Sequence, residues 1–258
     1  MSGKQGFFKV LGAEFKRVFG RPKALLFSLL FAVCAFVAFA GIIVLADFAV
    51  KEMGTEMPNE FIGFSTALSI LSLCFGIWAA AFSARDYNDG TILASLLATP
   101  RRGRLFLARL IPWVIVPVLF STLAIAGCFA FSIGTITDVQ NVLAQAGLTL
   151  ISMIAYTVLG FCCGTITKKG APAVFLYLGL TMLLPMVLST AGLFVPELIS
   201  KIIGWINTAL PGNAFAAIAG MASGTEGSLT ACIVTAAWTV IVPILSYILF
   251  KVRATLKI

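Results

Sequence analysis

The sequence contains no histidine and is poor in charge. Only 11% of its 258 residues are charged and 60% are hydrophobic, whereas soluble domains carry about 25% charged residues. The lack of histidine excludes haem ligation by histidine, Ser-His dyads and the zinc-binding helix of metalloproteases. One soluble core of this size does not need so much apolar surface, and the mean hydropathy is +1.06. We therefore expect lipid to be the solvent of this chain.

Long apolar runs fill most of the sequence. Crossing a bilayer takes about 20 predominantly apolar residues, and six segments meet this requirement: 24–46, 61–84, 105–133, 142–166, 171–195 and 228–250. The small residues at 38–40 resemble a signal-peptide cleavage site, but the apolar run continues to Ala46, so we expect an uncleaved first span. The sequence predicts an all-α integral membrane protein with a single transmembrane domain over residues 1–258.

The basic residues indicate how the spans are oriented. All but two of the 18 lysines and arginines fall in four places: residues 1–23, 85–109, 168–169 and 251–257. Basic loops stay on the cytoplasmic side of a membrane. We therefore expect six spans with both termini in the cytoplasm. Because the charges are divided among several loops, we do not expect the chain to bind nucleic acid.

The sequence also lacks the residues that would supply energy for transport. It has no G-x-x-x-x-G-K-[ST] loop for ATP. No acid or base stands in the middle of a predicted span, where the proton relays of carriers are found. The six cysteines lie within predicted spans, so we interpret them as packing residues and expect no metal site or disulfide. An ion-gradient-driven secondary carrier and, after it, an intramembrane enzyme remain as alternatives.

The N-terminal segment 1–23 has the pattern of an amphipathic helix. Its apolar residues recur at helical spacing, with Lys9, Lys16 and Arg17 on the other face. These apolar residues are Phe7, Phe8, Leu11, Phe15, Val18 and Phe19. We predict a helix that lies on the cytoplasmic surface of the membrane.

A polar insert at 86–104 interrupts the apolar runs. We expect Asp89 to be the N-cap of a short helix that begins near Gly90-Thr91 and ends at Thr99-Pro100. One face of this helix is apolar and consists of Ile92, Leu93, Leu96 and Leu97. We expect three basic residues that follow it to lie at the level of the lipid headgroups: Arg101, Arg102 and Arg104. The pattern fits a simple connector between spans or a helix that docks on a partner.

Residues 196–227 are apolar but contain Glu197, Lys201 and a central Leu-Pro-Gly-Asn. A seventh span here would place the basic C-terminal tail outside the cell, against the charge pattern. We therefore predict a re-entrant hairpin of two short helices that meet at Pro211-Gly212 on the outer side. Its turn supplies three candidates for an outer gate, Pro211, Gly212 and Asn213, and a packed extracellular cap is the alternative interpretation.

Three stretches together resemble permeases of the type-2 ABC exporter (ABC-2) family. An acid before Gly-Thr followed by ILASLLATPRRGRLFLARL is similar to the family's run after span 2. AEFKRVFGRPKALLF resembles its elbow helix, and LPGNAFAAIAG resembles the outer segment before the last span. The resemblance implies that the insert holds a coupling helix that docks on an ATPase subunit. The residues that would form this coupling site are Asp86, Asp89, Gly90, Thr91, Ile92, Leu93, Leu96 and Leu97.

The resemblance also implies the partners and the activity of the chain. It would pair with a second permease, identical or homologous, and with two copies of an ABC ATPase. The partner would bind ATP and magnesium, so we expect no cofactor in this chain and no catalytic residue. The resemblance further implies that the chain lies in the plasma membrane of a bacterial cell, and we expect export of amphipathic drugs, antimicrobial peptides or lipid-like cargo.

Overall fold

The computed structural model describes residues 7–19, 61–98, 102–131, 139–221 and 229–255, and every regular element in these ranges is a helix. The predicted first span, 24–46, lies outside the described residues. The elements are α1 (Phe7–Phe19), α3 (Phe61–Asn88), α4 (Thr91–Ala98), α5 (Arg102–Phe131), α6 (Val139–Thr167), α7 (Gly170–Leu178), η1 (Gly179–Leu183), α8 (Leu184–Ala191), α9 (Glu197–Ala209), α10 (Pro211–Met221) and α11 (Leu229–Thr255).

The all-helical fold agrees with the sequence prediction. Three helical segments within the described ranges are long and apolar enough to cross a membrane: 146–167, 170–191 and 229–252. α3 and α5 cover two further predicted spans and are 28 and 30 residues long. At 1.5 Å per residue each would extend for about 40–45 Å, which exceeds the thickness of a hydrocarbon core of about 30 Å. These lengths and compositions are those of a membrane protein.

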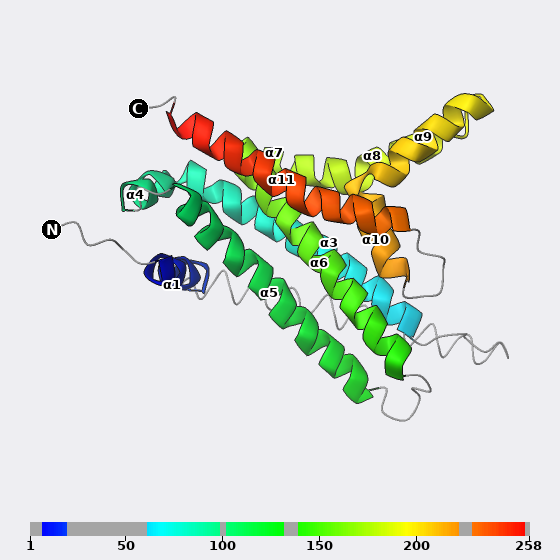
Figure 1. The fold of residues 1–258 in the computed structure, drawn as a ribbon, viewed down its shortest axis with the longest axis horizontal. Coiled ribbons are helices and arrows are strands. Elements are labelled where there is room, and N and C mark those ends of the chain that lie inside the picture. The colour runs from blue at the N-terminus through cyan, green and yellow to red at the C-terminus, as the bar shows by residue number, and fades with distance from the viewer. Residues whose placement is uncertain (1–6, 20–60, 99–101, 132–138, 222–228, 256–258) are drawn as a thin grey trace.

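α6 lies at the centre of the bundle, where it contacts α3, α5, α7, α10 and α11 (Figure 1). Its packing against α3 depends on small residues. A side chain at Gly160 would collide with the backbone of Gly76, and one at Gly164 would collide with Ser83. Small residues let helices in membranes approach until their backbones touch. This close contact therefore fixes the position of α3 along α6.

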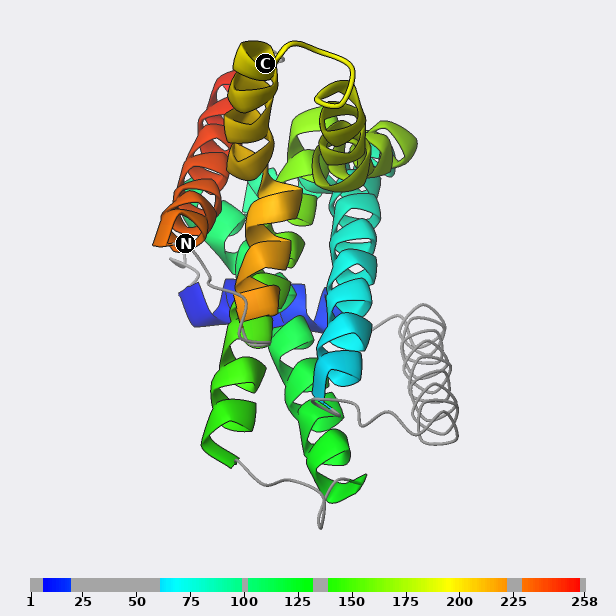
Figure 2. The same cartoon turned by 90° about the vertical axis from the view of Figure 1, so that its right-hand side faces the viewer.

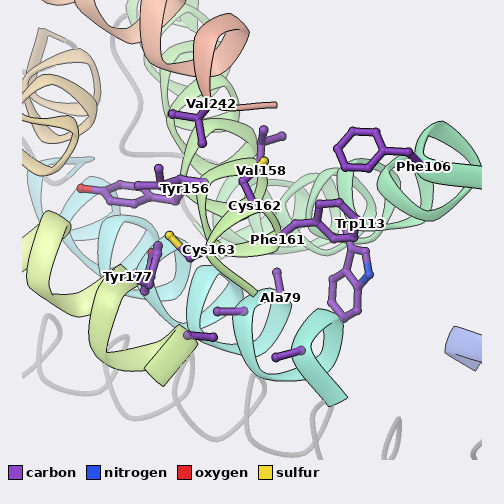
Figure 3. Packing of buried hydrophobic residues seen from close by; sticks show 14 of the residues in the cluster. Ala79, Phe106, Trp113, Tyr156, Val158, Phe161, Cys162, Cys163, Tyr177 and Val242 are labelled. Atoms are coloured by element: carbon purple, nitrogen blue, oxygen red, sulfur yellow. The ribbon is translucent and has the colours of Figure 1, made fainter. Parts of the chain in front are cut away.

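Aromatic and sulfur-containing side chains fill the space beside this contact. Figure 3 shows Tyr177, Cys163 and Ala79 gathered where α3, α6 and α7 meet. Cys162 and Cys163 are free and buried, as expected for packing residues. The Tyr177 ring covers Gly76, and its hydroxyl donates to the carbonyl of Leu73 at 3.3 Å. The buried hydroxyl of Tyr177 thus finds its partner on a neighbouring helix.

The loops that carry the basic residues meet at one end of the bundle, here called the α4 end. α1, α4 and the end of α11 lie there, and α1 runs crosswise to the long helices (Figures 1 and 2). Arg102 at the start of α5 donates to the carbonyl of Lys251 in α11 at 3.0 Å. Lys168, between α6 and α7, lies 5.7 Å from the centre of the Tyr87 ring on α3. The bundle thus gathers loops that the charge pattern assigned to one side.

The face that α1 turns toward the bundle differs from the predicted apolar face. Val10 and Glu14 are buried, and Phe7 and Leu11 pack beside them. Phe8, which the sequence grouped with Phe7 and Leu11, is 82% exposed. Part of the predicted apolar set of α1 therefore packs on the bundle together with an acid, while Phe8 is exposed.

The close contact of α3 with α6 gives a stability prediction. Gly164→Ala should lower the free energy of unfolding by about 1–3 kcal/mol, because its methyl group would overlap Ser83 and Ala80. Gly147→Ala, on the same helix, has open space around it and should be neutral or stabilising by up to about 1 kcal/mol. Reversible unfolding in mixed micelles measures both. Equal stability of the two variants would contradict the packing described for α6.

Candidate functional site: an ion cluster at the base of α4

The chain reverses between α3 and α4 at Gly90, whose φ is +66°. This left-handed conformation is the one in which helices commonly end at a glycine. α4 begins at Thr91, whose Oγ1 donates to the carbonyl of Asp86 at 3.3 Å. The predicted N-cap role of Asp89 is wrong, because Gly90 takes the position before the helix and Asp89 pairs with Arg85 at 3.3 Å. The turn is thus fastened to the last turn of α3.

Asp86 is the centre of an ion cluster that joins three helices. One of its carboxylate oxygens accepts from Arg17 of α1, and the other accepts from Arg109 of α5. Glu14 of α1 lies 3.5 Å from Nη1 of Arg17 and 3.9 Å from Nε of Arg109. We call these four residues the Asp86 cluster. Arg17 also donates to Thr91 Oγ1 at 2.8 Å, which brings α4 into the same network.

The charges of the cluster are well shielded from solvent. The exposed fraction of the side chain is 6% for Arg109, 11% for Glu14, 13% for Asp86 and 22% for Arg17. Two positive and two negative groups balance, which is the condition under which charges are tolerated away from water. Bonds between guanidinium and carboxylate groups are also stronger than neutral hydrogen bonds. Removing Asp86 would therefore leave two shielded arginines without their shared partner.

Burial has a second effect on Glu14. Desolvation raises the pKa of its carboxyl group above the ordinary value of 4.5, although Arg109 and Arg17 act in the opposite direction. For Glu14, then, the loss of hydration outweighs the attraction of the two arginines. Asp86 makes the direct bonds to both arginines, so the two acids have different roles in the cluster.

The predicted apolar face of α4 is divided between two environments. Ile92 is buried and Leu96 is half-buried against the core of the bundle. Leu97 is 87% exposed. The side chain of Leu93 lies outside the described residues. Ile92 therefore holds α4 to the chain itself and is not free for a partner, whereas Leu97 is.

The other predicted site residues lie elsewhere. Arg102 binds the backbone of α11, as given above, Arg104 is exposed, and Arg101 lies outside the described residues. Pro211 and Gly212 are buried, and Asn213 donates to the carbonyl of Asn207 at 2.9 Å. Pro211 and Gly212 are thus packed inside the chain, and Asn213 is half-buried.

Sequence reasoning placed Asp86 in the site but missed its partners. Glu14 is the one acid among the first 46 residues, in a segment otherwise basic, and Arg109 is the one charge within the apolar run 105–133. Each is an isolated charge among residues of a different character. Such a charge predicts a partner of opposite charge elsewhere in the chain, and this signal could have pointed to the pairing.

No protein-family model and no curated protein matches this chain. Within the described residues, no group of three histidine, cysteine, aspartate or glutamate side chains is arranged to hold a metal ion. The candidate site therefore consists of the Asp86 cluster and, next to it, the short helix α4 with an exposed leucine.

Two acids three residues apart provide a matched test of the cluster. Asp86→Asn should lower the free energy of unfolding by about 3–5 kcal/mol, because two shielded arginines lose their shared partner. Asp89→Asn should cost less than about 1 kcal/mol, since its pair with Arg85 is solvent-exposed. Unfolding in mixed micelles measures both changes. Similar losses for the two variants would contradict the central role of Asp86.

Glu14 should behave in the opposite way to Asp86. Because its pKa is raised, the folded chain holds this proton more tightly than the unfolded chain does, and stability falls as pH rises above 4.5. Glu14→Gln should therefore be more stable than the wild type at pH 7, with a difference that vanishes below pH 4.5. Unfolding free energies across this pH range test the sign. A variant less stable at pH 7 would show that the ion pairs of Glu14 outweigh its desolvation.

Proposed function

We propose that this chain is the membrane-spanning permease subunit of an ATP-driven exporter of the ABC-2 type, working with a separate ATPase. The observation that supports this proposal most directly is the attachment of α4 to the bundle through the Asp86 cluster. A short helix with an exposed leucine stands at one end of an apolar bundle, and the Asp86 cluster ties its first residue to α1, α3 and α5. Force applied to α4 would reach three helices directly.

The contacts around α4 suit the transmission of motion. Thr91 binds both the carbonyl of Asp86 and the guanidinium of Arg17. Ile92 and Leu96 pack into the core on the same side. Packed cores and paired charges deform little and pass on displacement as whole elements. In the proposed complex the ATPase contacts α4 through Leu97, and α1, α3 and α5 move with it.

The placement of charges supports an external energy source. Among the described residues, the buried charged side chains are Glu14 and Arg109, and both belong to the Asp86 cluster. The other residues in the buried polar class are serines and threonines, such as Ser152, Thr157 and Thr165. A proton-driven carrier uses carboxylates or histidines within its core. We therefore place ATP and Mg²⁺ on the partner subunit.

The assembly that we propose contains two permeases and two ATPases, with the second permease identical or homologous to this chain. Apolar side chains exposed on α8 and α11, among them Met186, Ile233 and Ile241, are available to lipid or to the second permease. The cargo that suits an uncharged core is amphipathic or lipid-like, as drugs, antimicrobial peptides and lipids are.

Reconstitution in liposomes, alone and together with a candidate ABC ATPase, tests the proposal. Transport should require ATP and Mg²⁺ and should survive collapse of the proton gradient. Leu97→Asp should lower ATPase binding and transport at least tenfold, because a charge buried unpaired costs several kcal/mol. Asn88→Asp adds the same charge at an exposed position close by and should act as the wild type.

Two results would overturn this function. Cargo movement by the chain alone, driven by a proton or sodium gradient, would identify a secondary carrier. Recovery of the ATPase with Leu97→Asp at wild-type stoichiometry would show that α4 is not the contact.

A further inference from the structure

The start of α5, the end of α11 and the junction between α6 and α7 come together at the α4 end. Thr165 of α6 and Ser246 of α11 share a hydrogen bond between their hydroxyls, so these two helices are in contact near their ends. Lys169 and Lys251 follow this contact by four and five residues. From α5, Arg102 reaches the carbonyl of Lys251. We call Arg102, Lys169 and Lys251 the Arg102 patch.

The backbone holds the cations of this patch in defined places. After the end of α6, Lys168 has a left-handed φ of +60°, and its amide donates to the carbonyl of Gly164 at 3.0 Å. Lys169 comes next in an extended conformation, with φ −128° and ψ 136°, directly before α7. The bond to the carbonyl of Lys251 holds the Arg102 guanidinium, which has further N–H donors for another acceptor. The fold therefore orders the patch before any ligand binds.

The positive charges of the Arg102 patch are not balanced by acids. Glu14 and Asp86 are paired with the two arginines of the Asp86 cluster, and Asp89 is paired with Arg85. In the part of the chain that the structure describes, none of the three members of the patch makes an ion pair. Both of its lysines are exposed. The patch can therefore attract an anion.

Exposed apolar side chains lie next to these cations on the same helices. Ile248 and Ile244 precede Lys251 by three and seven residues, a spacing that places all three on one face of α11. They are 49% and 53% exposed. On α7, Phe175 lies within two turns of Lys169 and is 70% exposed. A ligand with an anionic head and apolar tails would match both parts of this surface.

The chemistry of the patch suits a phosphate group. A guanidinium can form two parallel hydrogen bonds to phosphate oxygens, and ammonium groups add positive charge beside it. Basic sites between membrane helices on the cytoplasmic side bind acidic lipid headgroups. An acidic protein surface would match the charges but would leave the exposed isoleucines without apolar partners. The observations therefore favour a lipid.

We propose that the Arg102 patch binds the headgroup of an anionic phospholipid, and that the acyl chains of this lipid lie along Ile244 and Ile248. One lipid would then join α5, α7 and α11 at the α4 end. The proposal goes beyond the headgroup contact expected for Arg102 from the sequence, because Arg102 acts here together with lysines of two other elements. It does not depend on the ATPase.

Native mass spectrometry of the full chain, titrated in micelles with phosphatidylglycerol or phosphatidylcholine, tests the site. The wild type should bind one phosphatidylglycerol about tenfold or more tightly than phosphatidylcholine. The pair Lys169→Gln and Lys251→Gln should weaken phosphatidylglycerol binding about tenfold or more, because each basic residue near an acidic headgroup contributes about fivefold. Binding of phosphatidylcholine should not change. The pair Lys169→Arg and Lys251→Arg keeps both charges and should retain the preference.

A matched control removes two other exposed lysines from the same end of the bundle. Lys9→Gln with Lys16→Gln on α1 changes the net charge by the same amount and should leave the bound phosphatidylglycerol in place. Equal weakening by the two glutamine pairs would show attraction to total charge and would overturn the site. Equal affinity of the wild type for the two lipids would overturn it as well.

Two further outcomes identify a different ligand. If soluble glycerol phosphate binds as tightly as phosphatidylglycerol, the patch takes a free phosphate and the lipid proposal fails. If the glutamine pair at Lys169 and Lys251 lowers binding of an ABC ATPase but leaves phosphatidylglycerol binding unchanged, the patch is a protein contact. Failure of the proposed exporter function would change neither lipid titration.

Discussion

The structure at the α4 end depends on a single carboxylate. Asp86 accepts bonds from two arginines that come from different helices, and little water reaches any of the three side chains. Charges in such a place are stable only when they are paired. α1 must therefore lie across the bundle at a position from which Arg17 reaches Asp86. In the same way, α5 must be placed so that Arg109 reaches Asp86. Because Thr91 joins the same network, the position of α4 follows from these pairs as well.

Beyond the Asp86 cluster, the described helices differ in how much of their surface is buried inside the chain. Contact between the backbones of α3 and α6 leaves no room for side chains at Gly160 and Gly164. These two helices cannot slide past each other without breaking this contact. α8 and α9 have almost no buried residues and are bounded by a π turn and an extended residue.

Much of the fold could be predicted from the sequence, because length and hydropathy determine where helices form in an apolar chain. The helices over 61–84, 105–131, 142–166 and 229–250 and the break before Pro211 follow from such signals. The sequence signals do not predict which side chains pair with each other in space. Asp89 has the sequence position of an N-cap, yet Asp86, one helical turn earlier, faces the arginines. Ile92 turns inward and α10 joins the core for the same reason, since tertiary contacts decide which face is buried.

A double-mutant cycle on Arg17 and Asp86 tests the central claim most directly. The free energy of unfolding in mixed micelles is measured for Arg17→Ala, Asp86→Ala and their combination, and the exposed pair Arg85 and Asp89 serves as the control. If Asp86 joins α1 to α3, the two changes should be non-additive by about 1 kcal/mol or more, while the control cycle stays within about 0.5 kcal/mol of additivity. Additive losses for Arg17 and Asp86 would show that α1 and α4 are not joined through this carboxylate.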